Sequence, residues 1–356
     1  MTKKPQQVVE LVADDNGYAS HKIARFNEQG QIVCTKFDTS IQIGGSTLTS
    51  VDGNKEDTYE VLGEDGSISN TYTCSSAITQ PLDLRNSNYP FVEANRVLMQ
   101  HSLLRSGMEG KQVQIAVTLP FADYFTVGGQ MNVDIQERSQ ANFIQNNVVS
   151  EHGKGQVKIV GARVFPEGMC AFYDWALDES CNQTPGFEEL SDNDGSALIV
   201  DIGGSTTDIV CIRMVDGNIK IDHAHSGTTK IGVLDVREEI NKAYQKRFST
   251  GGYESALSAR ALARIMETGT HKAGGQVHDL KADLEAIFRA VTQRVVSYMQ
   301  SKAGRMNDFE VIHFVGGGAV LFGESLKTAV PVSSIGDEFA NARGAIKYMK
   351  GQQAEA

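Results

Sequence analysis

The strongest constraint on the fold is a pattern that occurs twice along the chain. Residues 8–33 and residues 197–221 both open with an apolar run that ends at an acid, Asp15 in the first copy and Asp201 in the second. Each copy then continues through a glycine-containing turn, a strand, a polar turn with glycine and a further strand. Two copies of one β-meander, roughly half a chain apart, predict two α/β domains of similar plan that face each other.

Length and composition agree with two globular domains. The chain has 356 residues, which is more than one hydrophobic core usually serves, and 40% of them are hydrophobic. The net charge of −11 argues against broad direct contact with nucleic acid or an anionic membrane. Five scattered cysteines form no CxxC pair, and no stretch has the length of a signal peptide or a membrane span. We therefore expect a cytoplasmic protein with unpaired thiols and no membrane contact.

Other segments predict the elements around the two meanders. Apolar runs indicate strands, and apolar residues at helical spacing indicate helices, one of which opens at Pro166. The triple glycine Gly316, Gly317 and Gly318 predicts a turn after which the strand continues. Residues 38–88 show short strands and little else. The strands are expected at 111–120 and 156–166, and the helices at 166–180, 233–248, 281–302 and the C-terminus.

The turn-rich, acidic segment 181–196 is the best candidate for a domain boundary. It divides the chain into domain I, residues 1–185, and domain II, residues 196–336. The C-terminal helix, within residues 337–356, is expected to return to domain I.

The two turns, which follow Asp15 and Asp201, contain the residue types of a phosphate-binding site. A glycine turn presents several backbone N–H groups to one point, and hydroxyl and lysine side chains add further donors. Asp15 and Asp201 would hold Mg²⁺ through water rather than touch phosphate. Either hairpin alone is equally consistent with an ordinary turn, but both together with the triple glycine indicate a nucleotide clamp. The candidate nucleotide-binding residues are Asp15, Asn16, Gly17, Ser20, Lys22, Gly203, Gly204, Ser205, Thr206, Gly316, Gly317 and Gly318.

These motifs resemble those of a known superfamily. VDIGGSTTDIV resembles the second phosphate loop of the actin, heat-shock chaperone and sugar kinase superfamily, DDNGYASHK resembles the first, and FVGGGAVL resembles the adenosine loop. VTLPFADYFTVGGQMNVDIQERSQANF and VFPEG are similar to segments of ParM, also called StbA, the plasmid-segregating actin-like ATPases. The resemblance implies an actin-like fold, in which two similar RNase H-like α/β domains flank a nucleotide cleft. The first loop is closer in spacing to that of actin, and residues 1–7 have no counterpart.

The resemblance also assigns roles to single residues. Glu167, the acid after the proline of VFPEG, would position the attacking water from the first turn of a helix, and Asp201 would organise Mg²⁺ and that water. The alternative for Glu167 is a favourable interaction with the helix dipole. Arg237 and Glu238 are candidates for ribose and base contacts, although a solvated helix face is the favoured explanation.

Three further features have two interpretations each. Asp208 either fixes its hairpin, which we favour, or contacts the metal. His313, inside an apolar strand, is more consistent with a core residue than with a ligand. Tyr124 and Phe125 lie where the family makes filament or adaptor contacts, and simple core packing explains them equally well.

The function implied by the resemblance is that of a Mg²⁺-dependent ATPase whose nucleotide state governs self-assembly. ATP, with GTP left open, would draw the two domains together, and the closed subunit would stack head to tail into a filament. Hydrolysis would then allow disassembly. A ParR-type adaptor at a centromere-like site would contact DNA in place of this acidic chain. The competing class is a small-molecule, sugar-type kinase of the same superfamily, and a third is a nucleotide-dependent scaffold that does not polymerise.

Overall fold

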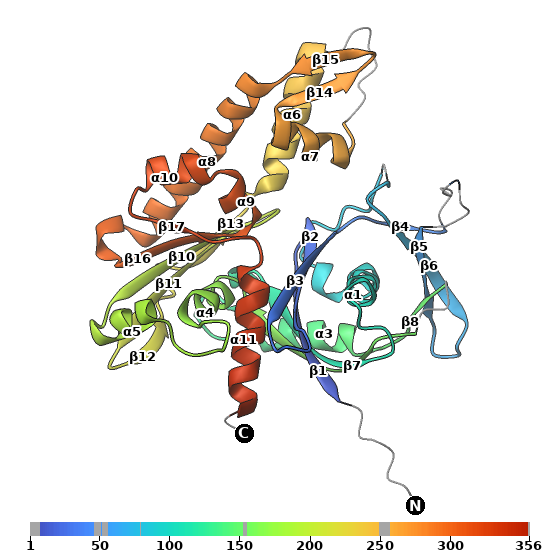
Figure 1. Ribbon diagram of the computed structural model, residues 1–356, viewed down its shortest axis with the longest axis horizontal. Coiled ribbons are helices and arrows are strands. Elements are labelled where there is room, and N and C mark those ends of the chain that lie inside the picture. The colour runs from blue at the N-terminus through green and yellow to red at the C-terminus, as the bar shows by residue number, and fades with distance from the viewer. Residues whose placement is uncertain are drawn as a thin grey trace, which may run out of the picture.

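The computed structural model describes residues 8–45, 51, 56–78, 80–151, 155–248 and 257–354. A five-stranded and a six-stranded sheet dominate it, and they lie on either side of a central pair of helices, α4 and α11 (Figure 1). The first sheet has the order β3-β2-β1-β7-β9 and the second the order β12-β11-β10-β16-β17, with β13 added beside β11. Residues 1–7, for which the sequence offers no role, lie outside the described residues.

The same connectivity builds both sheets. In each, the first strand pairs antiparallel with the second and the second with the third, while the fourth and fifth strands join in parallel. The doubled meander of the sequence is therefore confirmed as a doubled sheet. The strands of the first sheet are β1 (Val9–Asn16), β2 (Ser20–Phe26), β3 (Ile32–Asp38), β7 (Gln112–Leu119) and β9 (Lys158–Pro166). Those of the second are β10 (Ser196–Ile202), β11 (Thr207–Val215), β12 (Asn218–Ile221), β13 (Gly227–Thr229), β16 (Val311–Val315) and β17 (Ser334–Ile335).

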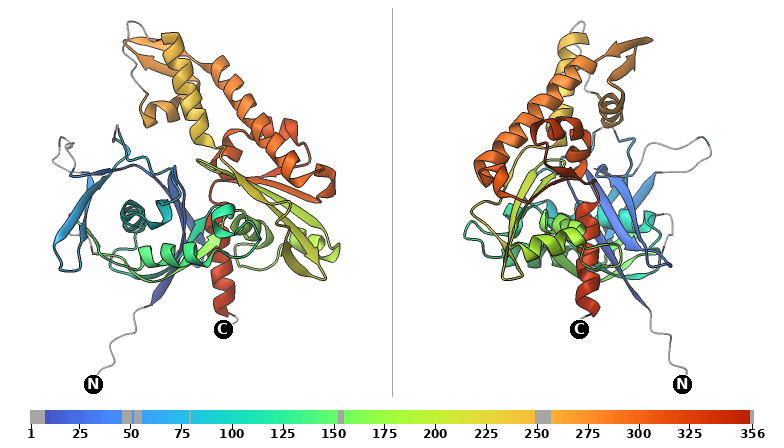
Figure 2. Two further views of the ribbon diagram at one scale, coloured as in Figure 1. Left: turned by 180° about the vertical axis from the view of Figure 1, so that it is seen from behind. Right: turned by 60° about the vertical axis from the view of Figure 1, so that its left-hand side comes forward.

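Each large sheet and the helices that pack on it form one lobe. A smaller sheet extends each lobe. Residues 38–88, where the sequence indicated only short strands, supply most of a four-stranded sheet that encloses α1 together with the first sheet (Figure 1). Its strands are β4 (Ile41–Ile43), β5 (Asp57–Leu62), β6 (Ile68–Cys74) and β8 (Val148–Ser150). The second lobe carries a hairpin of β14 (Thr270–Ala273) and β15 (Gln276–Asp279) beside the C-terminal end of α6 (Figure 2).

Helices cover both sheets. The predicted helix at 233–248 is confirmed residue for residue as α6, and that at 281–302 as α8, whose Leu284, Val291, Val295 and Met299 are buried against the second sheet. The helices are α1 (Glu93–Arg105), α2 (Phe121–Tyr124), α3 (Val133–Phe143), α4 (Met169–Ala176), α5 (Pro185–Asp192), α6 (Val233–Phe248), α7 (Ala259–Thr268), α8 (Lys281–Ala303), α9 (Gly316–Leu321), α10 (Gly323–Ala329) and α11 (Ala340–Ala354). Two 3₁₀ turns, η1 (Tyr89–Phe91) and η2 (Met306–Asp308), complete the set.

Two local predictions were wrong. Pro166 ends strand β9 instead of opening a helix, so Glu167 lies in the turn before α4 and not in its first turn. The triple glycine does not form a turn that continues a strand, because α9 begins at Gly316. The C-terminal helix, α11, runs from Ala340 to Ala354 and lies within the expected segment 337–356.

The helix α11 packs on the first sheet. Ala342, Ala345 and Ile346 share a buried cluster with Ala13 and Ala24 of β1 and β2. The division at residues 185 and 196 stays a prediction. The helix α4 contributes to both lobes, since Cys170 belongs to this cluster while Met169 and Phe172 pack against strands of the second sheet.

No helix among the described residues is both long and apolar enough to span a bilayer.

Candidate functional site

The turn between β1 and β2 is fastened to the end of β7. The Asp15 carboxylate accepts hydrogen bonds from Lys22 Nζ at 2.7 Å and from Thr118 Oγ1 at 2.9 Å. The Thr118 backbone N–H donates to Asn16 Oδ1 at 3.1 Å. Burial lowers the pKa of Lys22, but the carboxylates of Asp15, Asp201 and Glu167 outweigh burial and raise it above the usual value. A charged lysine is therefore fixed beside the turn.

The turn between β10 and β11 is tied to the start of α6 through its carbonyls. Val233 N–H donates to Gly203 O at 3.1 Å, and Leu234 N–H donates to Gly204 O at 2.8 Å. A carbonyl and the next N–H of a trans peptide point in opposite directions. The N–H groups of Gly204 and Ser205 therefore point away from α6. Only glycine fits at Gly232, because a Cβ there would overlap Gly204 O.

Both turns line one cavity. Its walls are formed by the first turn, the second turn, the end of β7 with the residues after it, and η1, and Glu167 faces it from the turn before α4. The turns also touch, since a Cβ on Gly204 would lie 2.7 Å from Ala19 Cβ. The cavity holds about 30 Å³, which is room for a few water molecules. The lining residues are Asp15, Asn16, Gly17, Tyr18, Lys22, Tyr89, Pro90, Thr118, Leu119, Pro120, Glu167, Asp201, Gly203, Gly204, Ser205 and Thr206.

Carboxyl groups crowd this region, with Lys22 as the only cation that lines the cavity among the described residues. Burial, with repulsion from neighbouring carboxylates, raises the pKa of Asp201 to about 6 and that of Asp208 to about 7. The same two causes raise the pKa of Glu167 well above its ordinary value. Without a bound cation the site therefore favours protonated carboxyl groups.

We expect the nucleotide-free protein to lose stability as pH rises. Groups whose pKa is raised on folding hold protons in the native state that the unfolded chain has released, so their contribution is present at low pH and lost through pH 6–7. Urea unfolding should show the unfolding free energy falling by roughly 4 kcal/mol between pH 5 and pH 8. Asp208→Asn should reduce this slope. A free energy that is flat or rises with pH would contradict the electrostatic account.

The donor set suits magnesium bound through water. Mg²⁺ prefers oxygen ligands, keeps several waters and is held by one or two carboxylates together with phosphates. Asp15 and Asp201 both line the cavity, and Glu167 joins them. Within the described residues no three acidic, histidine or cysteine side chains form a direct metal cage. The residues present therefore fit a hydrated magnesium ion that shares its coordination with a phosphate.

The helix α11 joins the acidic residues of the two lobes through Asn341, which sequence reasoning missed. Asn341 Nδ2 donates to Asp201 Oδ2 at 2.6 Å, and the Gly168 backbone N–H donates to Asn341 Oδ1 at 3.1 Å. One buried amide thus sets the position of Asp201 relative to the turn that carries Glu167. No local signal could have revealed it, because the three positions lie up to 173 residues apart.

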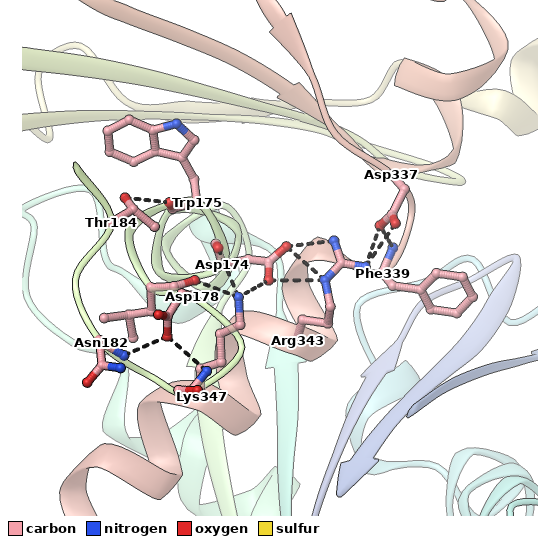
Figure 3. A network of polar contacts seen from close by, with 11 residues as sticks. Asp174, Trp175, Asp178, Asn182, Thr184, Asp337, Phe339, Arg343 and Lys347 are labelled. Carbon is pink, nitrogen blue, oxygen red and sulfur yellow. Dashed lines mark hydrogen bonds and ion pairs between the residues drawn. The ribbon is translucent and has the colours of Figure 1, made fainter. Parts of the chain in front are cut away.

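The position of Asn341 is fixed by an ionic network on the same helix (Figure 3). Arg343 contacts both carboxylate oxygens of Asp174 on α4, at 2.6–3.1 Å, and also Asp337 at 2.8 Å. Lys347, which is buried, donates to Asp174 Oδ1 at 2.8 Å and to the carbonyl oxygens of Asp174 and Leu177. Bidentate arginine contacts fix geometry as well as charge. The network therefore holds α11 at one register against α4.

Some candidate residues lie outside the cavity lining. Ser20 is buried in β2, and Gly316, Gly317 and Gly318 open α9 behind β10, where Gly316 packs against Asp201. Arg237 and Glu238 line a second cavity, of about 620 Å³, which shares Tyr18 with the first. Glu238 forms an ion pair of 2.9 Å with Arg85 across the two lobes.

Asp208, His313 and the aromatic pair Tyr124 and Phe125 each have defined contacts. Asp208 accepts hydrogen bonds from Phe121 N–H and Thr228 Oγ1, which agrees with a hairpin-fixing residue. His313 is partly buried in β16 and contacts Ser334 Oγ at 2.8 Å. The rings of Tyr124 and Phe125 pack against each other at 4.8 Å, and Phe125 also contacts His223.

Two family models match the chain, one in each half. Residues 11–178 match the N-terminal region of plasmid segregation protein ParM, and residues 199–328 match the C-terminal region of the archaeal actin homologue MreB-like. Together they include both turns and Glu167. No curated protein matches the chain significantly in sequence.

Solved structures with the same fold cover nearly the whole chain. A 15-stranded ParM filament from Clostridium botulinum is 20% identical, with a TM-score of 0.74 over 96% of this chain and 99% of that one. A non-polymerisable quadruple mutant of pCBH ParM is also 20% identical, with a TM-score of 0.73 over 97% and 100%. The archaeal actin homologue Ta0583, in complex with ADP, is 15% identical, with a TM-score of 0.71 over 98% and 100%. The fold is therefore actin-like, with two α/β lobes around the cavity.

Proposed function

We propose, on the premise that the chain belongs to the ParM/StbA family of actin-like proteins, that it is a Mg²⁺-dependent ATPase that assembles into filaments and segregates DNA. The relatives support the general class, since ParM filaments and an ADP complex of an archaeal actin homologue share its fold. The finer role is argued from the residues of this chain. The sugar-type kinase alternative has no observation in its favour here.

The observation that carries the proposal is the meeting of two turns, one from each sheet, at a single acidic cavity. The second turn directs the N–H groups of Gly204 and Ser205 away from α6, and the first holds Lys22 in its charged form. Backbone N–H groups and a lysine are donors for phosphate oxygens, while crowded carboxylates require a cation. A magnesium-bound polyphosphate satisfies both requirements at once.

Each polar group then has a proposed role. Asp15 and Asp201 hold the waters of the magnesium ion, which when bound neutralises charge on the phosphates. Glu167 orients the attacking water, because its carboxyl group faces the cavity from the turn before α4. Asn341 keeps Asp201 and that turn at a fixed separation. Asp208 holds the segment after Pro120 and takes no part in metal binding.

The base and ribose would occupy the larger cavity, where Arg237 and Glu238 lie on one wall. The smaller cavity is too narrow for phosphates while the turns are in contact. The lobes must therefore separate before nucleotide binds, and the Arg85–Glu238 ion pair must open with them. Closure around ATP then selects the subunit shape that stacks head to tail.

Hydrolysis would remove the γ-phosphate that links the two turns, so that subunits relax and filaments disassemble. A ParR-type adaptor would join the filament to a centromere-like DNA site, which leaves this acidic chain without direct nucleic-acid contact. The preference for ATP or GTP is measured by comparing assembly with each nucleotide.

Mixing the purified protein with Mg-ATP is expected to raise light scattering and to move the protein into the pellet on ultracentrifugation. Phosphate release should follow assembly, and excess EDTA should prevent both. Parallel samples with GTP measure the nucleotide preference, and a sugar panel measures kinase activity. Phosphorylation of a sugar without assembly would overturn the proposal, as would assembly that is indifferent to nucleotide.

A further inference from the structure

A chain of polar side chains lies buried beneath the first turn, and the roles proposed so far do not use it. His21 Nδ1 is 2.6 Å from Asp14 Oδ2, and His21 Nε2 is 2.8 Å from Tyr89 Oη. Asp14 and His21 are fully buried, Tyr89 is 2% exposed, and Asp14 Oδ1 has no hydrogen-bond partner. Burying such groups costs free energy that apolar residues would not. A purpose beyond packing is therefore expected.

The chain continues to the backbone of the first turn through Thr39. The Tyr89 hydroxyl interacts with the side chain of Thr39, and Thr39 Oγ1 donates to Gly17 O at 2.8 Å. The Thr39 backbone N–H also donates to Ala19 O at 3.1 Å. Thr39 thus holds two carbonyls of the turn; it lies outside the lining of the smaller cavity and lines the larger one.

Geometry fixes the two ends of this set of contacts. At one end His21 lies between Asp14 Oδ2 and Tyr89 Oη, and at the other the Thr39 hydroxyl donates to Gly17 O. The Tyr89 hydroxyl and the Thr39 side chain meet between these ends.

The consequence for the turn follows from peptide geometry. Because Thr39 holds the carbonyls of Gly17 and Ala19, the N–H groups of Tyr18 and Ser20 point away from Thr39. The carbonyls of the turn between β10 and β11 are held in the same way, by the backbone N–H groups at the start of α6. Free rotation of the Gly17–Tyr18 peptide would withdraw one donor from the cavity that both residues line.

We propose that Asp14, His21, Tyr89 and Thr39 are positioning residues that preset the backbone of the first turn for nucleotide phosphate. This rests on the proposed nucleotide site. The turn would contact phosphate equally in the bound ground state and in the transition state. These four side chains therefore act on nucleotide affinity and little on the rate of the chemical step.

The test compares Tyr89→Phe, Thr39→Val and Thr39→Ser in the full-length protein. Tyr89→Phe and Thr39→Val each break the chain by one hydroxyl, and we expect Mg-ADP binding about five- to tenfold weaker, with KM raised and kcat within about twofold of wild type. Thr39→Ser keeps the hydroxyl and should bind Mg-ADP with wild-type affinity. The double variant should bind no more than about twofold more weakly than Thr39→Val alone, since Tyr89 acts through Thr39.

Tyr59→Phe is the matched control, because Tyr59 is buried in the same lobe and its hydroxyl contacts His101 Nδ1 at 3.0 Å. It should lose stability in urea unfolding as Tyr89→Phe does but bind Mg-ADP normally. Wild-type affinity in Tyr89→Phe and Thr39→Val would overturn the inference, as would an equal affinity loss in Tyr59→Phe. If the wild-type protein binds no nucleotide at all, the proposed function fails instead.

Discussion

ATP hydrolysis by Glu167→Ala is expected to be at least about 100-fold slower than by the wild-type protein, because loss of a group that orients and polarises water costs that much or more. Nucleotide binding and filament assembly should persist, since Glu167 contributes no donor to phosphate and lies outside both turns. Filaments of the variant should therefore be long-lived after ATP addition. Phosphate release and sedimentation measured on the same samples separate the two effects.

Glu188→Ala is a suitable control for this variant, because Glu188 is exposed on α5. It should hydrolyse ATP and disassemble as the wild-type protein does. Normal phosphate release by Glu167→Ala would remove Glu167 from the mechanism. Loss of nucleotide binding in that variant would instead make Glu167 a binding residue.

Gly344→Ala is expected to destabilise the protein by about 3 kcal/mol or more, the range of overpacked and strained core sites. Gly344 is the point at which α11 meets α4, and a Cβ there would overlap the carbonyl oxygen of Cys170. The helices would have to separate, and the Arg343–Asp174 and Lys347–Asp174 contacts would lengthen (Figure 3). Urea unfolding measures the loss directly.

Gly351→Ala provides the control on the same helix, because no atom lies within 4 Å of a Cβ at that position. Alanine favours helix over glycine by up to about 1 kcal/mol, so this variant should be as stable as wild type or more so. Equal stability of the two variants would show that α11 and α4 are not in the close contact described.

The sequence predicts the architecture well where a local pattern carries the information. Both meanders can be predicted because an apolar strand, an acid and a glycine turn lie within a few residues of one another. The helix α6 can be predicted from its amphipathic spacing. The sheet of β4, β5, β6 and β8 could not be predicted, since β4 and β8 have only three residues each and β8 joins from beyond α3.

The site is predictable only in part, for the same physical reason. Asp15 and Asp201 could be paired from the repeated motif, and the structure places both at one cavity. Asn341 reaches Asp201 across 140 residues and has no motif of its own. Thr39 acts through carbonyls that carry no side-chain signature. Glu167 was named from the resemblance and lines the cavity, while its catalytic role stays a prediction. The backbone around it was predicted wrongly, because a proline can end a strand as readily as it opens a helix.

The central claim is that turns from two lobes hold the same magnesium-bound polyphosphate. A crystal structure of the protein with Mg²⁺ and a non-hydrolysable ATP analogue tests it most directly. The account predicts phosphate oxygens within hydrogen-bond distance of the Tyr18 N–H on one side and of the Gly204 and Ser205 N–H groups on the other, with Asp15 and Asp201 facing the metal through water. A nucleotide that contacts only one turn, or that binds outside the cavity, would contradict it.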